Sequence, residues 1–151
     1  MKQRRVFLKS AAGLGAAGSM AAMASAASTA PNRANAKGGV RLGNLFFSSG
    51  LTGVRAEARK DPLVFGGDIK EQTHNILKAH KANLEALGSS LENVVKVTVF
   101  MADVKTEKNA MNEVYAQYFS KNAPARSAVG ADFPDTATRV EIELVAWIPN
   151  S

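Results

Sequence analysis

The chain contains no cysteine. This absence excludes disulfide bonds, thiolate metal sites and cysteine nucleophiles. Histidine is also scarce, with only His74 and His80 present. The two are six positions apart and would project from different faces of a helix, so they do not form an i,i+4 metal pair. We interpret His80, which lies on an apolar stripe, as a core-edge histidine satisfied by a hydrogen bond.

Acidic residues are missing from the first 26 positions, whereas Lys2, Arg4, Arg5 and Lys9 all lie there. The formal net charge of the whole chain is +6, which leaves only +2 for the residues after position 26. A strongly basic groove is therefore not expected, and the charge distribution argues against a nucleic-acid partner.

Residues 1–26 also lack a hydrophobic run long enough to span a membrane. They combine a basic head, a short Ala/Gly-rich middle and Ala24-Ser25-Ala26, which are the three parts of a secretory signal. Arg4-Arg5 followed by Val-Phe-Leu-Lys resembles a twin-arginine export signal. The middle is too short for a bilayer of about 30 Å, so we expect no stable membrane anchor. We expect cleavage near Ala26 and a periplasmic product.

The remaining chain has the composition of one globular domain. The sequence has 151 residues, of which 46% are hydrophobic, and this is typical of a folded protein rather than a disordered one. Residues 27–39 are small and polar, and we expect them to form an N-terminal arm without regular structure. The folded domain is expected over 40–151.

Hydrophobic periodicity predicts five regular segments, namely a broken strand over 40–49, a helix over 68–87, a strand over 94–101, a helix over 105–119 and a strand over 140–148. A turn at Gly43-Asn44 breaks the first strand. Asp68 and Glu71 form a capping-box-like start for the first helix, and Gly88 is suited to end it. With a further short apolar run before the last strand, this order predicts an α+β fold: one sheet with two helices on one face.

Two strands indicate which faces are buried. In 94–101, Val95, Val97 and Val99 are expected to share one face. In 140–148, an apolar row faces one side, and the other side bears Glu141, Glu143, Val145 and Trp147. An exposed apolar sheet face usually marks an interface, so we expect an oligomer.

Four segments together resemble the RidA (YjgF) family: 67–101, Asn112-Glu-Val-Tyr115, Pro124-Ala-Arg126 and Val140-Glu-Ile-Glu143. The match covers most of 40–149. The resemblance implies a mixed sheet like that of bacillus-type chorismate mutase. It also implies a homotrimer whose sheets form a central barrel, with three sites between subunits. The implied activity is hydrolysis of 2-imino and enamine acids, such as 2-iminobutanoate and 2-iminopropanoate, to 2-oxo acids and ammonia.

The resemblance also implies roles for individual residues. Arg126 matches the family arginine that binds the substrate carboxylate, and Glu141 matches the acid near the attacking water. Ser49 and Asn112 match positions that shape the pocket. A guanidinium can clamp a carboxylate with two parallel hydrogen bonds, and a carboxylate can orient and deprotonate water. We therefore expect Arg126 and Glu141 to meet in one site, with no metal or organic cofactor.

Alternatives remain open for these residues. Arg126 could be a structural ion pair at a strand start, and Glu141 could be a sheet-edge acid or a partner of Arg139. Two positions depart from the family pattern, because Ala36 stands where the family has a site tyrosine and Ala128 where it has a cysteine. A second hypothesis is a non-catalytic trimer that binds small carboxylates or client proteins. A third is a scaffold domain, which predicts a monomer.

Overall fold

The computed structural model describes residues 32–61 and 64–149. The predicted export signal and cleavage site lie outside these residues. The described chain forms a seven-stranded sheet with the spatial order β1-β2-β3-β7-β5-β6, and β4 pairs with β7. Its strands are β1 (Arg33–Ala36), β2 (Gly39–Leu42), β3 (Leu45–Ser48), β4 (Leu51–Thr52), β5 (Val94–Met101), β6 (Ala125–Gly130) and β7 (Val140–Trp147).

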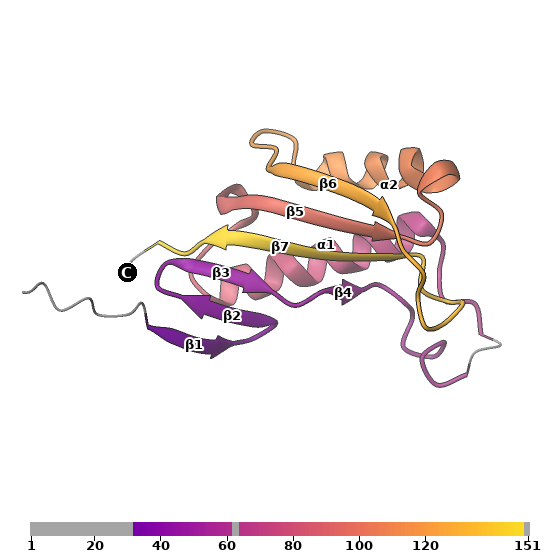
Figure 1. Cartoon of the computed structure of the whole chain (residues 1–151), viewed down its shortest axis with the longest axis horizontal. Helices are drawn as coiled ribbons and strands as arrows, with labels where there is room; N and C mark the ends of the chain where they lie inside the picture. The colour runs from indigo at the N-terminus through magenta and orange to yellow at the C-terminus, as the bar shows by residue number, and fades with distance from the viewer. Residues whose placement is uncertain (1–31, 62–63, 150–151) are drawn as a thin grey trace, which may run out of the picture.

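Both helices, α1 (Ile69–Ala86) and α2 (Val104–Tyr118), lie on the same side of the sheet, behind it in Figure 1. A short 3-10 turn, η1 (Leu91–Asn93), precedes β5. The sheet is mixed, because β5 and β6 run parallel while the other paired strands are antiparallel. The predicted α+β class, with two helices on one face, is confirmed.

The helix boundaries follow the local sequence. The Asp68 carboxylate accepts a hydrogen bond from the Glu71 backbone N–H at 2.8 Å and caps α1. After the other end of α1, Gly88 has φ +72°, a conformation that favours glycine. The Asp103 carboxylate caps α2 by accepting hydrogen bonds from the backbone N–H groups of Lys105 and Thr106.

The core lies between the sheet and the two helices. Its fully buried side chains include Phe46, Ile76, Leu77, Leu84, Val97, Val99, Met101, Met111 and Ile142. His80 is buried with them, and its Nε2 lies 2.9 Å from the Ile142 carbonyl oxygen. Burial lowers the pKa of His80, which favours a neutral ring that donates this hydrogen bond. The predicted hydrogen bond is confirmed, but His80 is fully buried rather than at the core edge, and its Nδ1 has no partner among the described residues.

The prediction of an unstructured arm was wrong from residue 33 onward, where β1 begins. This strand forms a hairpin with β2, in which Arg33 is opposite Leu42 and Ala36 is opposite Gly39. The turn between them uses Gly38, at φ +78°. β1 is mostly exposed, so its sequence has no apolar alternation, and pairing with β2 rather than burial defines it.

The predicted face of β5 was wrong at one residue. Val97 and Val99 are fully buried, but the Val95 side chain is 51% exposed. A register shift between Val94 and Lys96 interrupts the pairing with β7. A bulge of this kind places one extra residue in a strand and breaks the two-residue alternation.

The alternation of β7 is confirmed, since Val140, Ile142, Leu144 and Ala146 are buried and the intervening residues are not. The face of the sheet away from the helices, here called the open face, includes exposed apolar side chains from several strands. They are Leu45, Phe47, Val129 and Trp147. Among the described residues, no helix is long and apolar enough to cross a membrane.

Candidate functional site

Arg126 lies on β6, an end strand of the sheet, where it is paired with Val97 of β5. Residues paired in register point to the same face, and Val97 is buried against the helices. The Arg126 side chain therefore faces α2, and its guanidinium carbon lies 4.5 Å from the centre of the Tyr115 ring. Within the described part of the protomer, Arg126 has no ion pair or side-chain hydrogen bond. The structure therefore does not show the alternative of a structural ion pair at Arg126. The N–H groups of the Arg126 guanidinium remain available to a ligand.

A pocket of about 390 Å³ opens between α2 and the start of β6. We call it the Arg126 pocket, and it is lined by Asn112, Tyr115, Ala116, Phe119, Ala123, Pro124 and Arg126. The structure thus brings together two of the predicted site residues, Arg126 and Asn112. Small and apolar side chains form most of the remaining wall, so the guanidinium is the pocket's principal charge.

Two polar atoms of residues lining the Arg126 pocket are buried without a hydrogen-bond partner among the described residues, Asn112 Oδ1 and the Tyr115 hydroxyl. Burial raises the pKa of Tyr115 to about 12, although the nearby positive charge of Arg126 acts in the opposite direction. The hydroxyl is therefore protonated at neutral pH. The sequence analysis named Tyr115 only as the end of the Asn112-Glu-Val-Tyr115 segment and gave it no role in the site. Its spacing of four from Phe119, just before Pro124-Ala-Arg126, is a signal that could have indicated this ring.

Glu141 lies on the open face. On β7 it is opposite Thr52 of β4 on one side and Phe100 of β5 on the other. Its carboxylate lies directly over Gly50, where a β-carbon would overlap the Glu141 side chain. Arg139 does not pair with Glu141, because its Nε donates to Glu107 Oε1 at 2.6 Å. The proposed Arg139 partnership is therefore absent from the protomer.

Ser49 lies beside Gly50, between β3 and β4, and its side chain is exposed. Its backbone N–H donates to the Gly38 carbonyl at 2.8 Å. The preceding residue, Ser48, is tied to the sheet, because its hydroxyl oxygen accepts a hydrogen bond from the Leu144 backbone N–H at 2.8 Å. Ser49 therefore lies next to Gly50, the residue that the Glu141 carboxylate covers, and it does not line the Arg126 pocket.

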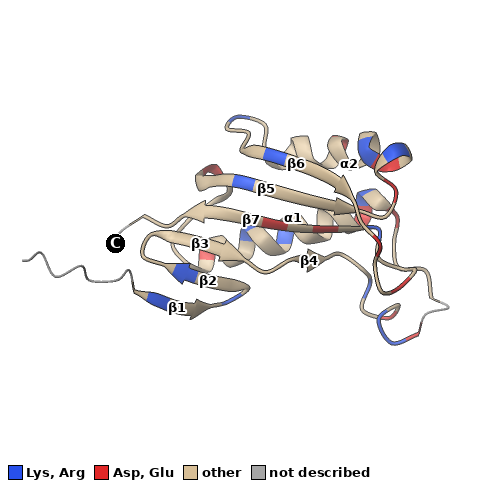
Figure 2. Ribbon diagram, viewed as in Figure 1, with Lys and Arg blue, Asp and Glu red and all other residues tan. Residues whose placement is uncertain are grey.

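Arg126 and Glu141 do not meet within one copy of the chain, so the expectation that they share a site between subunits stays a prediction. Val97 of β5 is paired with both Arg126 and Leu144, and these three residues face the helices. Glu141 has the opposite parity on β7 and faces away. Figure 2 shows the acidic segments of β7 in the same sheet as the basic segments of β5 and β6. The predicted site residues thus lie in two groups on opposite faces of the sheet.

The two departures from the family pattern lie on β6 and β1. Ala128 follows Arg126 by two residues on β6, shares its face and packs against the core. Ala36 ends β1 and also packs against the core. Within residues 32–61 and 64–149, no group of three or more His, Asp or Glu side chains is placed to hold a metal ion.

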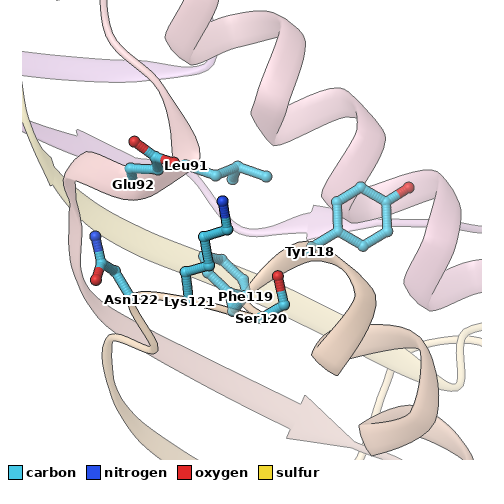
Figure 3. A pocket seen from close by; sticks show the side chains of 7 residues that line it. All are labelled: Leu91, Glu92, Tyr118, Phe119, Ser120, Lys121 and Asn122. Atoms are coloured by element: carbon cyan, nitrogen blue, oxygen red, sulfur yellow. The ribbon is translucent and has the colours of Figure 1, made fainter.

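Figure 3 shows another pocket, of about 160 Å³, at the end of α2. It is lined by Leu91, Glu92, Tyr118, Phe119, Ser120, Lys121 and Asn122. None of the predicted site residues lies in it. Phe119 lines both this pocket and the Arg126 pocket.

Comparisons with known proteins agree with this architecture. The family model described as Endoribonuclease L-PSP matches residues 25–148. A RutC family protein of Pyrococcus horikoshii is 39% identical over 108 residues, which cover 72% of this chain and 82% of that protein. The 2-iminobutanoate/2-iminopropanoate deaminase of Homo sapiens is 37% identical over 107 residues, which cover 71% of this chain and 75% of that protein. The crystal structure of yeast Mmf1 has a TM-score of 0.63 and 32% identity, covering 79% of this chain and 91% of that one.

Proposed function

The chain belongs to the endoribonuclease L-PSP family, that of the RidA (YjgF) proteins, and from this premise we propose that it is an imino-acid deaminase. Its substrates are reactive 2-imino and enamine acids, such as 2-iminobutanoate and 2-iminopropanoate. Water adds to the C=N carbon, the C–N bond breaks, and the products are a 2-oxo acid and ammonia. Water is the only co-reactant, and the proposal includes no cofactor.

The observation that supports this proposal most directly is the state of Arg126. Its guanidinium lies in a pocket with an aromatic ring beside it, and no carboxylate of the described protomer forms an ion pair with it. A cation held in this way has free N–H donors for the carboxylate of a ligand. Two parallel hydrogen bonds then fix the orientation of the substrate as well as its charge.

Glu141 has the second role. Its carboxylate orients a water molecule toward the imine carbon and accepts a proton from it, while the departing nitrogen gains the protons needed to leave as ammonia. Imine hydrolysis is intrinsically easy, so positioning and modest acid–base assistance are sufficient. Because Glu141 and Arg126 lie on opposite faces of one sheet, we propose that each complete site takes them from two neighbouring copies in a homotrimer.

The deaminase proposal is tested with 2-iminobutanoate generated in the assay by an amino-acid oxidase, its decay being followed by semicarbazide competition. Wild type is expected to accelerate the decay. Arg126→Ala is expected to lower kcat/KM by about a hundredfold, because a charge-assisted bidentate contact is lost. Arg55→Ala is the matched control, since Arg55 pairs with Glu71 on the surface, and it is expected to keep its activity.

A second candidate function is supported by the departure at Ala36. Without the tyrosine that the family has there, the same pocket would bind small carboxylates without turning them over. Binding of 2-oxobutanoate by wild type, with no acceleration of imine decay, would support this function. Loss of that binding in Arg126→Ala would show that the same guanidinium is used.

We also propose that the protein is exported through the twin-arginine route, on the strength of residues 1–26 alone. Replacement of Arg4 and Arg5 by lysine is expected to retain the protein in the cytoplasmic fraction. Periplasmic recovery of that double variant would contradict the export proposal.

A further inference from the structure

Arg126 is the last member of a stack of three side chains. Tyr115 lies on α2 and Phe119 directly follows its last residue, with ring centres 4.6 Å apart and a tilt of 34° between the rings. The Arg126 guanidinium carbon lies 4.5 Å from the centre of the Tyr115 ring. Tyr115 and Phe119 are each only 7% exposed. The ring that faces the guanidinium is therefore held in place by its own neighbours.

The stack explains how a long side chain is positioned without an ion pair. An arginine has several rotatable bonds, and fixing them has an entropic cost. A carboxylate partner would fix the guanidinium but would also occupy the N–H groups that a ligand needs. An aromatic face attracts the cation through its quadrupole and leaves the in-plane N–H groups unoccupied.

We propose that Tyr115 is a positioning residue that holds the Arg126 guanidinium by a cation–π stack and so keeps its N–H groups directed at an incoming carboxylate. The inference rests on the proposed role of Arg126 as the carboxylate clamp. It assigns to α2 a part in ligand recognition that depends on the ring and not on the hydroxyl. The hydroxyl is buried and has no partner among the described residues, so its removal does not disturb the stack.

The test measures calorimetric binding of 2-oxobutanoate, the stable product of 2-iminobutanoate hydrolysis, to the full-length protein and its variants. Tyr115→Phe retains the ring and is expected to bind within about twofold of wild type. Tyr115→Leu removes the aromatic face and is expected to bind about tenfold more weakly, the range of a desolvated cation–π contact. Pentafluorophenylalanine at position 115 keeps the shape of a phenyl ring but reverses its quadrupole, and it is expected to weaken binding as leucine does.

Tyr118→Leu provides the matched control. Tyr118 is an aromatic residue on the same helix, but it lines the pocket of Figure 3, and its hydroxyl contacts His74 Nδ1 at 2.9 Å. The same truncation at this position is expected to leave 2-oxobutanoate binding unchanged. Thermal unfolding of each variant shows whether a loss of binding merely follows a loss of folded protein.

The outcomes separate this inference from the proposed function. Weaker binding by the leucine and fluorinated variants, with tight binding by the phenylalanine variant, supports the positioning role. Equal binding by the fluorinated and phenylalanine variants overturns it, as does a tenfold loss in Tyr115→Phe. If Arg126→Ala binds as wild type does, the carboxylate clamp itself is wrong. If wild type binds but does not accelerate imine decay, only the deaminase activity is wrong.

Discussion

Arginine side chains in this protein differ in function because their immediate neighbours differ. Arg55 is paired with Glu71, and Arg139 is paired with Glu107. Arg126 instead has a tyrosine ring beside it and a pocket in front of it. The same residue type thus serves as a structural link at two positions and as a candidate ligand clamp at the third. Only the contacts distinguish these roles.

Gly50 provides a test of Glu141 at the scale of one residue. In Gly50→Ala, the new β-carbon would overlap the Glu141 carboxylate, which is the flexible end of its side chain. We expect the carboxylate to move while the backbone stays in place, so kcat for imine hydrolysis falls by about tenfold or more. The melting temperature is expected to change little. Enzyme kinetics and thermal unfolding check the two parts.

The control for that experiment is Gly130→Ala on β6. There the nearest atom to a new β-carbon is Val104 Cγ1 at 3.6 Å, an ordinary contact. This variant is expected to match wild type in both measurements. Full activity in Gly50→Ala would mean that the Glu141 carboxylate does not orient the attacking water.

At the scale of elements, Gln72 connects α1 to two loop segments, residues 66–67 before the helix and residues 137–139 before β7. Its side chain is fully buried, and its Nε2 donates to the carbonyl oxygens of Gly66, Gly67 and Ala137. Its Oε1 accepts a hydrogen bond from the Arg139 backbone N–H at 3.0 Å. Residues 137–139 lead into β7, so this side chain fixes how the strand with Glu141 enters the sheet.

Gln72→Leu is expected to lower the free energy of unfolding by about 2–4 kcal/mol. Leucine has a similar volume but leaves buried backbone groups without partners, and such groups are costly. Urea denaturation measures the change. Gln117→Leu, an exposed position on α2, is expected to stay within about 0.5 kcal/mol of wild type. An equally small change for Gln72→Leu would contradict a structural role for its hydrogen bonds.

At the scale of the whole molecule, two features support the proposed homotrimer. The open face exposes Phe47 and Trp147 to solvent, and monomeric proteins rarely leave such a face uncovered. The Arg126 pocket and Glu141 lie on opposite sides of the sheet. In a cyclic trimer, every interface is formed by two different surfaces of the chain, one from each of two neighbouring protomers. One arrangement then covers the open face and completes the sites.

Mixing two inactive variants tests this arrangement. Arg126→Ala still supplies Glu141, and Glu141→Ala still supplies Arg126. If each site uses two adjacent protomers, an equal random mixture of the two variants in trimers is expected to recover about a quarter of wild-type activity. Co-expression with separable tags, followed by imine-hydrolysis assays, measures the recovery, and light scattering measures the mass of the assembly.

Each variant alone must form the same assembly as wild type, so that lost activity reports the site rather than the fold. Mixed trimers that stay inactive, beside an active wild type, would place the two residues in separate functions. A monomeric wild type would leave the sites incomplete and the trimer proposal wrong.

The sequence by itself determined both helices, the main strands and most of their buried sides. Capping by Asp68, the turn at Gly43 and the alternation of Val140 to Trp147 are local patterns, and each was read correctly because its cause lies within a few neighbouring residues. The fold class followed from the order of the elements. The placement of Asn112 in the Arg126 pocket was also implied by the family resemblance.

Only the tertiary structure decided how those elements bring the functional residues together. The parallel pairing of β5 with β6 turns Arg126 toward Tyr115, and the parity of β7 turns Glu141 the other way. The bulge beside Val95 and the pairing of β1 likewise depend on partner strands. Such features arise from contacts between residues far apart in the chain, and local periodicity contains no information about which strands will pair or in what register.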